Sequence, residues 1–400
     1  MESNDTNQTM RNPWLSVFAI ALGAIALVIT EFLPVGLLPD ICRSFGVLEG
    51  TAGLAVTSTA LLGAVAAPLT TIVIGQLDRR IVLLVLTFML IVSSVLSVFA
   101  PSFGVFIIAR IILGLGVGGF WAIAVASAVR LVPQDKIALA SSIVLGGISI
   151  GTVVSVPTGT FIASHFDWRA AFTAASVFAV VTFIIQLILL PKIPMKQGVR
   201  VKDYVELFRF NKIRMIFAIV VFLVGGQYAA YTYVTPYLQQ VTGTSSNVLG
   251  VLMLIYGIVV CLGNFIGGFI SKIGLRRMNA MTAFIYLVSL AAISLLGHSS
   301  IIVTIALITW AFAWGMAPLG AQLWIFSSIR NAPEAAQAIF TGVFQLSISV
   351  GSLIGGVAVN AINLTSSMWL GVILVALALI MTFMVGRDDN ESSGKLTTEN

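Results

Sequence analysis

Residues 103–122 read FGVFIIARIILGLGVGGFWA and carry one charged side chain, that of Arg110. A bilayer core about 30 Å thick is crossed by roughly 20 apolar residues in a helix, so this stretch predicts a transmembrane helix. Arg110, Gly114, Gly118 and Ala122 recur every four residues and therefore share one face. Because small residues let helices approach closely, we expect Arg110 to face protein and not lipid.

The same apolar character recurs eleven more times, with short breaks between the stretches. Only 9% of the 400 residues are charged and 58% are hydrophobic, whereas a soluble domain carries about 25% charged residues. We therefore expect an all-α membrane protein with twelve transmembrane helices. The first, from Trp14 to about Leu38, is too long for a cleaved signal peptide. The other centres are Leu62, Leu90, Leu115, Ile150, Val180, Phe222, Ile258, Leu287, Ala313, Ser349 and Val375.

The basic residues predict how these helices are oriented. If the amino terminus is cytoplasmic, 18 of the 21 Lys and Arg residues fall in cytoplasmic segments, as the positive-inside rule requires. Arg43 and Arg169 fall outside, and Arg110 falls within a span. Both termini are therefore expected in the cytoplasm. The net charge of +6 then reflects topology and requires no anionic partner.

One long polar break divides the chain six helices from six. It predicts an N-terminal bundle over residues 1–190, a cytoplasmic linker over 191–214, a C-terminal bundle over 215–386 and a cytoplasmic tail over 387–400. Within the linker, residues 201–210 alternate apolar and charged side chains. That pattern fits either an amphipathic helix on the membrane surface or a simple connection.

The second half resembles the first at a nearly constant offset. Arg79 and Arg80 recur 197 positions later as Arg276 and Arg277. Such repeats predict two pseudo-symmetric six-helix bundles that hold a solute between them near the middle of the membrane. Residues expected to set the helix packing are Gly114, Gly118, Gly147, Gly151, Pro157, Gly159, Gly351 and Gly355.

Several motifs resemble those of the major facilitator superfamily, in its twelve-helix drug:proton antiporter branch. The superfamily motif between the second and third helices is similar to Gly75, Asp78, Arg79 and Arg80, in compressed form, and its repeat is similar to the segment from Gly267 to Arg277. Arg110 with Gly114 resembles the fourth-helix motif. The fifth-helix antiporter motif is matched in part, with Ser155 at a position where the branch usually has Gly.

The resemblance implies proton-driven export across a bacterial inner membrane, with the proton gradient in place of a cofactor and no bound metal. It also implies that Asp78, Arg79, Arg80, Arg276 and Arg277 form a conformational latch. Three shorter runs resemble the sugar and purine-nucleoside exporters of this branch. They begin at Glu31, Gly118 and Gly226.

Glu31 is the one acidic residue well inside a predicted span, and Arg110 is the one basic residue there. Ionisable residues within a membrane are costly and are functional candidates. Both are expected in the outer third of the bilayer, where they could meet. A pair that opens and closes during transport would couple proton entry to solute exit. The alternatives are a static pair, or a Glu31 placed at the interface because Pro34 ends its helix early.

Aromatic and amide side chains on four of the predicted helices suit a planar solute of low charge. The same side chains could instead pack against lipid, and Trp14 and Trp168 are expected to be interface anchors. Asn360 could add a second amide to the cavity from the eleventh helix. The predicted substrate cavity comprises Trp121, Gln227, Tyr228, Tyr231, Trp310, Trp314 and Gln345.

The sequence therefore predicts a monomeric, proton-coupled exporter of a small organic solute such as a purine nucleoside, sugar or drug. The alternatives are a proton-independent facilitator of a nutrient and a transporter-like sensor. An enzyme is not expected, because His165 and His298 fall in outer loops and no catalytic set can be assembled. Cys42 and Cys261 lie far apart and are expected to be unpaired, and no nucleic-acid partner is expected.

Overall fold

The computed structural model describes residues 12–75, 77–194, 211–328 and 333–385, and the long elements within these ranges are helices. The greater part of the predicted linker, the segment 201–210 and the tail 387–400 lie outside the described residues. Helix α9 begins at Asn211, inside the range expected for the linker.

Helices of the first half are α1 (Pro13–Phe45), α2 (Glu49–Ala52), α3 (Leu54–Val73), α4 (Arg79–Val98), α5 (Phe103–Val129), α6 (Ile137–His165) and α7 (Trp168–Leu189). Those of the second half are α9 (Asn211–Tyr231), α10 (Val234–Gln240), α11 (Ser246–Ile270), α12 (Leu275–Leu296), α13 (Ser300–Ser328), α14 (Pro333–Ala361) and α15 (Leu364–Met384). Two single turns of 3₁₀ helix, Gln134–Lys136 and Ser271–Ile273, precede α6 and follow α11.

Within the described residues, twelve helices are long and apolar enough to cross a membrane. They contain the eleven predicted centres and the range from Trp14 to Leu38. The predicted all-α membrane fold is confirmed. The first helix differs from expectation because it continues through Pro34 and Pro39 to Phe45. Gly46, whose φ of 65° is left-handed, ends it, and the N–H of Gly46 bonds the carbonyl of Cys42. Pro34 therefore does not end α1 early.

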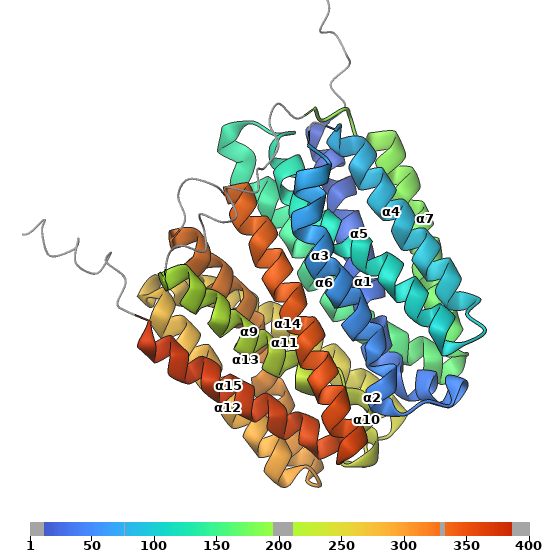
Figure 1. The fold of residues 1–400 in the computed structure, drawn as a ribbon, viewed down its shortest axis with the longest axis vertical. Helices are drawn as coiled ribbons and strands as arrows, with labels where there is room; N and C mark the ends of the chain where they lie inside the picture. The colour runs from blue at the N-terminus through green and yellow to red at the C-terminus, as the bar shows by residue number, and fades with distance from the viewer. Residues whose placement is uncertain (1–11, 76, 195–210, 329–332, 386–400) are drawn as a thin grey trace, which may run out of the picture.

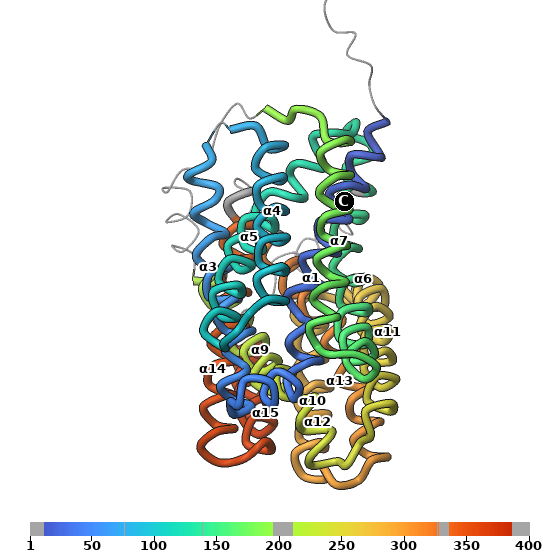
Figure 2. Tube along the Cα trace, turned by 90° about the vertical axis from the view of Figure 1, so that its right-hand side faces the viewer, coloured from blue at the N-terminus to red at the C-terminus, as the bar shows by residue number. Residues whose placement is uncertain are grey.

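The two halves form separate groups of helices. Helices α1 to α7, blue to green, lie together on one side of the molecule, and α9 to α15, yellow-green to red, lie on the other (Figure 1). The perpendicular view looks from the side of the first half, and in it α6 lies beside α11 (Figure 2). The halves meet where α3 packs on α14 and where α6 packs on α11. A solute that moves between the halves would therefore pass between these helix pairs.

We call the end of the molecule that carries α2, α10 and Gly46 the α2 end, and the end where α7 stops and α9 starts the linker end (Figure 1). Hydrogen bonds join the halves at the α2 end. The Asn360 side chain accepts from the N–H of Gly50 at 2.9 Å, and the Ser352 hydroxyl donates to the carbonyl of Gly53 at 3.2 Å. Gln240 donates to Glu49 at 2.9 Å.

Toward the linker end, α6 and α11 separate. At Gly257 an added Cβ would lie 2.6 Å from the Cα of Val153, so the two backbones touch there. Gly146 and Gly268 occupy the same helix faces, two and three turns nearer the linker end. A Cβ at either would meet nothing within 4 Å. The halves are therefore closed at the α2 end and apart along this pair at the linker end.

Glycines of the predicted packing stripes lie where helix backbones come close. A Cβ at Gly118 would lie 2.8 Å from the Cα of Gly63, and one at Gly351 would lie 2.8 Å from the Cα of Gly225. At Gly147, Gly151, Gly159, Gly114 and Gly355 an added Cβ would also approach a neighbouring helix to 3.0 Å or less. Pro157 lies inside α6, which contacts α1.

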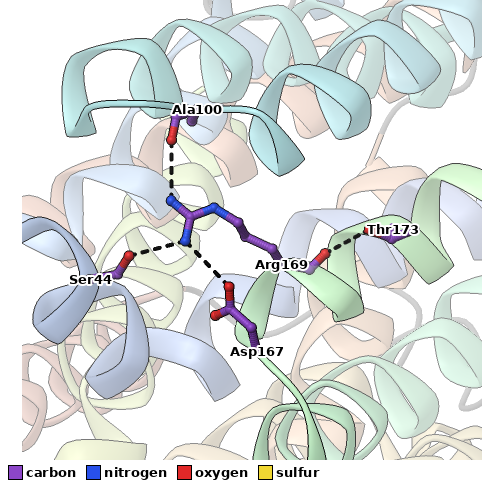
Figure 3. A network of polar contacts seen from close by, with 5 residues as sticks. All are labelled: Ser44, Ala100, Asp167, Arg169 and Thr173. Carbon is purple, nitrogen blue, oxygen red and sulfur yellow. Dashed lines mark hydrogen bonds and ion pairs between the residues drawn. The ribbon is translucent and has the colours of Figure 1, made fainter.

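Arg169 holds the α2 end of the first half together (Figure 3). Its guanidinium donates to the hydroxyl of Ser44 and the carbonyl of Ala100, each at 3.2 Å, and lies 3.4 Å from Asp167. It also lies over the ring of Trp168 at 4.5 Å. Trp168 is 3% exposed, so the expectation of an interface anchor is wrong. Its indole packs against neighbouring rings at the start of α7.

We expect Arg169→Ala to lower the free energy of unfolding by about 1–2 kcal/mol, because two hydrogen bonds that join separate chain segments are lost. The measurement is the thermal unfolding midpoint of the detergent-solubilised protein. Arg43→Ala is the control, since Arg43 is exposed and its partner Asp40 lies one turn away on the same helix. Equal midpoints for Arg169→Ala and the unaltered protein would show that the contacts of Arg169 do not stabilise the α2 end.

Candidate functional site

Glu31 lies near the middle of α1, 18 residues after Pro13 and 14 before Phe45. Because α1 is longer than expected, this place along the helix does not fix its depth in the bilayer, and the outer third stays a prediction. Its side chain is 5% exposed, and one carboxylate oxygen, Oε1, accepts a hydrogen bond from Nε2 of Gln345 at 3.0 Å. Gln345 lies near the middle of α14, in the other half. The bond therefore connects the two halves at the centre of both helices.

Arg110 is fully buried beside Glu31 but does not form a salt bridge with it. The guanidinium donates to the carbonyl of Thr30 at 3.0 Å and to the hydroxyl of Ser97 at 2.7 Å, and it lies over the ring of Phe172 at 4.9 Å. The predicted meeting of α1 and α5 at these residues is found. Arg110 donates to the backbone carbonyl of the residue before Glu31 and not to its carboxylate. The positive charge of Arg110 still acts on the carboxylate through space.

Aromatic rings surround the point where Glu31 meets the second half. The ring of Phe32, the next residue on α1, stacks on Tyr228 of α9 with centroids 5.8 Å apart and planes 18° apart. Trp314 lies edge-on to Tyr228 at 5.8 Å and close to Phe344 at 6.2 Å. Of the predicted cavity residues, Tyr228 thus lies near the carboxylate, and Trp314 packs against Tyr228. They provide flat apolar surfaces next to a group that accepts hydrogen bonds.

Gln227 lies deeper in the second half, and its amide is occupied by protein groups. Its oxygen accepts from the hydroxyl of Tyr286 at 2.5 Å and the indole of Trp310 at 2.7 Å, and its nitrogen donates to Tyr256 at 3.0 Å. Tyr231 stacks on Tyr256 at 5.1 Å. This arrangement favours a positioning role for Gln227, Tyr231 and Trp310 over direct contact with solute. The amide is buried, its oxygen already accepts two hydrogen bonds, and its nitrogen already donates one.

Trp121 and the half-exposed face of α1 lie on the linker side of Glu31. Leu22, Ile25, Ile29 and Phe32 are half-exposed at three- and four-residue spacing, while residues 33–38 are buried on all sides. Trp121 is half-exposed on α5 and packs edge-on against the ring of the preceding residue. This face of α1 is therefore half-exposed from Leu22 to Phe32 and covered from Leu33 toward the α2 end.

Some residues of this site were missed from the sequence, and one was misplaced. Tyr256 and Tyr286 could have been suspected, because the chain has only seven Tyr and these two lie in the middle of apolar spans. Phe32 and Phe344 carry no such signal among 25 Phe residues. Asn360, by contrast, lies at the α2 end, where it bonds Gly50 and is remote from Gln345 along α14.

Asp78 and Arg80 hold α4 to the end of α7. Asp78 caps α4 by accepting from the N–H of Arg80 at 2.9 Å, and it also accepts from the N–H of Ile193 at 2.8 Å. Arg80 donates to the carbonyl of Leu187 at 2.9 Å. Arg79 is buried, and its N–H donates to the carbonyl of Ile193 at 3.0 Å. In this conformation the contacts join parts of the same half.

The repeat of this cluster in the second half is built the same way. Arg276 donates to the carbonyls of Thr382 at 3.3 Å and Phe383 at 2.5 Å, at the end of α15. Arg277 follows it in the first turn of α12. Each half thus fixes its third helix to its sixth at the linker end, which keeps each bundle rigid.

Metal-binding side chains do not gather in the part of the chain that the structure describes. No group of three or more His, Cys, Asp or Glu side chains lies together there. Cys42 is buried at the α2 end of α1, and Cys261 lies on α11, and neither forms a disulfide.

The chain resembles known transporters along its whole length. Residues 20–335 match the sequence model of the Major Facilitator Superfamily. The purine ribonucleoside efflux pump NepI of Escherichia coli strain K12 is 32% identical over 385 residues, which cover 96% of this chain and 97% of that protein. The pump of the same name from Shigella dysenteriae serotype 1 has the same identity, with 98% of that protein covered.

Solved structures show the same fold at low sequence identity. A bacterial homolog of the human lysosomal transporter Spinster, in an inward-facing and unoccupied conformation, has a TM-score of 0.80 at 16% identity. The superposed region covers 95% of this chain and 98% of the homolog. A D-xylose-proton symporter has a TM-score of 0.75 at 16% identity, covering 92% and 97%.

Proposed function

The chain belongs to the major facilitator superfamily, and from that premise we propose that it exports a purine nucleoside in exchange for protons. The family predicted from the sequence is confirmed, and the protein is a multi-pass membrane transporter. The observation that carries the proposal is the bond from Gln345 to Glu31, which places a buried carboxylate among aromatic rings where the two halves meet.

A purine nucleoside fits the chemistry of this place. The base is planar and can stack on rings such as Phe32 and Tyr228, and its ring nitrogens and the ribose hydroxyls can bond a carboxylate and an amide. The 32% identity to pumps named for purine ribonucleoside efflux, over nearly the whole chain, supports the same solute class. Sugars and drugs, also expected from the sequence, are not supported both by the stacking and hydrogen-bonding groups of this place and by the names of the related pumps.

Alternating access would follow from the way the halves touch. They are hydrogen-bonded at the α2 end and separate along α6 and α11 at the linker end. The distribution of Lys and Arg favours a cytoplasmic linker end, with both termini inside. On that orientation the structure is the state that loads solute from the cytoplasm. Rocking of one half against the other would open the α2 end for release.

Proton coupling is assigned to Glu31, the only buried Asp or Glu among the described residues. The carboxyl group of Glu31 accepts one hydrogen bond, from Gln345, and lies near a positive charge. It can hold or release a proton when the halves move, because the bond from Gln345 forms in only one of the two conformations. We place the protein as a monomer in a bacterial inner membrane, with the proton gradient as its energy source and no bound cofactor.

The test is transport into inverted membrane vesicles or proteoliposomes with an imposed pH gradient. Radiolabelled inosine, guanosine and adenosine are compared with a sugar and a cationic drug. Antiport is expected to give nucleoside accumulation that disappears when the gradient is collapsed. Nucleoside equilibration that does not depend on the pH gradient would instead indicate a facilitator. Accumulation of the sugar or drug alone would overturn the nucleoside assignment.

Opening at the α2 end can be tested by tethering it. In a protein with Cys42 and Cys261 changed to Ala, we expect Glu49→Cys and Gln240→Cys joined by a reducible bifunctional thiol reagent to lose nearly all transport. The two native side chains are hydrogen-bonded, so the reagent would hold the halves as they are. Reduction should restore transport. Each single-Cys variant treated with the reagent is the control, and full transport by the tethered protein would refute the opening.

A further inference from the structure

The carboxylate of Glu31 has acceptor capacity that the protein leaves unused. Gln345 donates to one oxygen, and the second oxygen accepts no hydrogen bond from the described residues. The two terminal nitrogens of Arg110 donate to Thr30, Ser93 and Ser97 and do not bond Glu31. The carbonyl oxygen of Gln345 is likewise without a donor among the described residues. Two acceptor oxygens from opposite halves therefore lie together, and an ionised carboxylate can only accept.

A flat apolar surface lies next to these acceptors. Phe32 is half-exposed on the face of α1 that leads to the linker end, and it stacks on Tyr228. A planar base that rests on this surface would present its edge, and not its face, to Glu31. The charge that acts on the carboxylate there comes from Arg110 on α5.

Purine bases differ in what their edge presents at ring position 1. Hypoxanthine carries an N–H there, and guanine carries an N–H with an amino group beside it, so both donate to a carboxylate. Adenine has a lone pair at the same position, which repels it. Discrimination is strong when a buried group is left without its partner, because the desolvated acceptor then loses its bond and regains none.

On the basis of the proposed function, we propose that Glu31 and Gln345 read the edge of the base and select nucleosides with an N–H at position 1. Inosine and guanosine are the preferred solutes, and adenosine is the poor one. Phe32 and Tyr228 supply the stacking surface, which all purines share. Glu31 therefore serves specificity as well as proton exchange.

A different role for the same contact is a brace that only holds α1 against α14. In that case changes at position 1 of the base would not matter, and Glu31→Gln would affect every nucleoside equally. The amide of Gln has a donor as well as an acceptor, so the edge-reading role predicts that it tolerates the lone pair of adenine. The two roles thus differ in the ratio of affinities and not in the overall rate.

The experiment is competition against radiolabelled inosine counterflow in proteoliposomes of the purified full chain. Competitors are inosine, 1-methylinosine, adenosine and 1-deazaadenosine, in which a C–H replaces the lone pair. For the unaltered protein we expect 1-methylinosine and adenosine to bind at least about tenfold more weakly than inosine, and 1-deazaadenosine to bind better than adenosine. In Glu31→Gln the inosine-to-adenosine ratio should fall at least about fivefold. Asp135→Asn, in the exposed 3₁₀ turn before α6, is the control.

Each outcome is decisive. Equal competition by inosine, 1-methylinosine and adenosine, with normal inosine counterflow, overturns edge reading and leaves nucleoside export standing. An unchanged ratio in Glu31→Gln, with weaker 1-methylinosine, shows that another group reads the base and also overturns it. If the folded, unaltered protein shows no inosine counterflow while other solutes are carried, the proposed function itself fails.

Discussion

Glu31→Gln is expected to abolish nucleoside accumulation driven by a pH gradient while leaving nucleoside counterflow at a measurable rate. The amide cannot exchange a proton, but its oxygen can still accept the hydrogen bond from Gln345, so the contact between α1 and α14 is kept. The loss should be complete, at least about a hundredfold in the accumulation ratio, because no other acidic side chain among the described residues is buried. Initial rates in inverted vesicles, with and without the gradient, measure it.

Asp135→Asn removes an acid from the exposed 3₁₀ turn before α6 and should accumulate nucleoside like the unaltered protein. Protein amount is equalised by quantifying the purified variants. If Glu31→Gln accumulated nucleoside at the rate of the control, proton coupling would have to be assigned elsewhere.

Gly118→Ala is expected to destabilise the protein severely, although it adds only one methyl group. Its Cβ would come within 2.8 Å of the Cα and carbonyl carbon of Gly63, which are backbone atoms of α3 and cannot rotate away. Relief requires α3 and α5 to move apart, and overpacking of this kind costs about 1–3 kcal/mol or more. We expect a lower thermal midpoint in detergent and a smaller yield of monodisperse protein on size exclusion.

Gly146→Ala is the matched control, because its Cβ would meet nothing within 4 Å. Alanine is also the better helix former by about 1 kcal/mol, so this variant should be as stable as the unaltered protein or slightly more stable. A Gly118→Ala protein that melted together with Gly146→Ala would show that the helices are not as close as described.

The sequence was sufficient for the fold because hydropathy is a local property. Each of the twelve spans is apolar over its own length, so no knowledge of its neighbours was needed. The predicted end of α1 was wrong because Pro34 and Pro39 indicate the end of a helix, whereas the helix continues through both and ends at Gly46. A proline removes one donor from a helix, and packing against other helices compensates for that loss.

The site was harder to predict because partners come from distant parts of the chain. Glu31 and Arg110 were recognisable by charge alone, but Gln345 lies 314 positions away and is one of many neutral polar residues. Gln227 shares a helix face with Tyr231, four residues on, yet its amide is bonded to Tyr256, Tyr286 and Trp310. Helical spacing shows which residues share a face but not what covers that face.

The contacts that close the α2 end have a consequence for the energetics of the cycle. Gly50 with Asn360, and Gly53 with Ser352, are bonds between neutral groups, each contributing about 0.5–1.5 kcal/mol net because water offers similar partners when the end opens. The third bond, from Gln240 to the carboxylate of Glu49, is exposed to water and involves no opposite charge. An end sealed by buried ion pairs would be harder to release and would respond to salt. This one can leave the two conformations nearly equal in free energy, so that a modest difference in solute or proton binding is enough to drive the exchange in one direction.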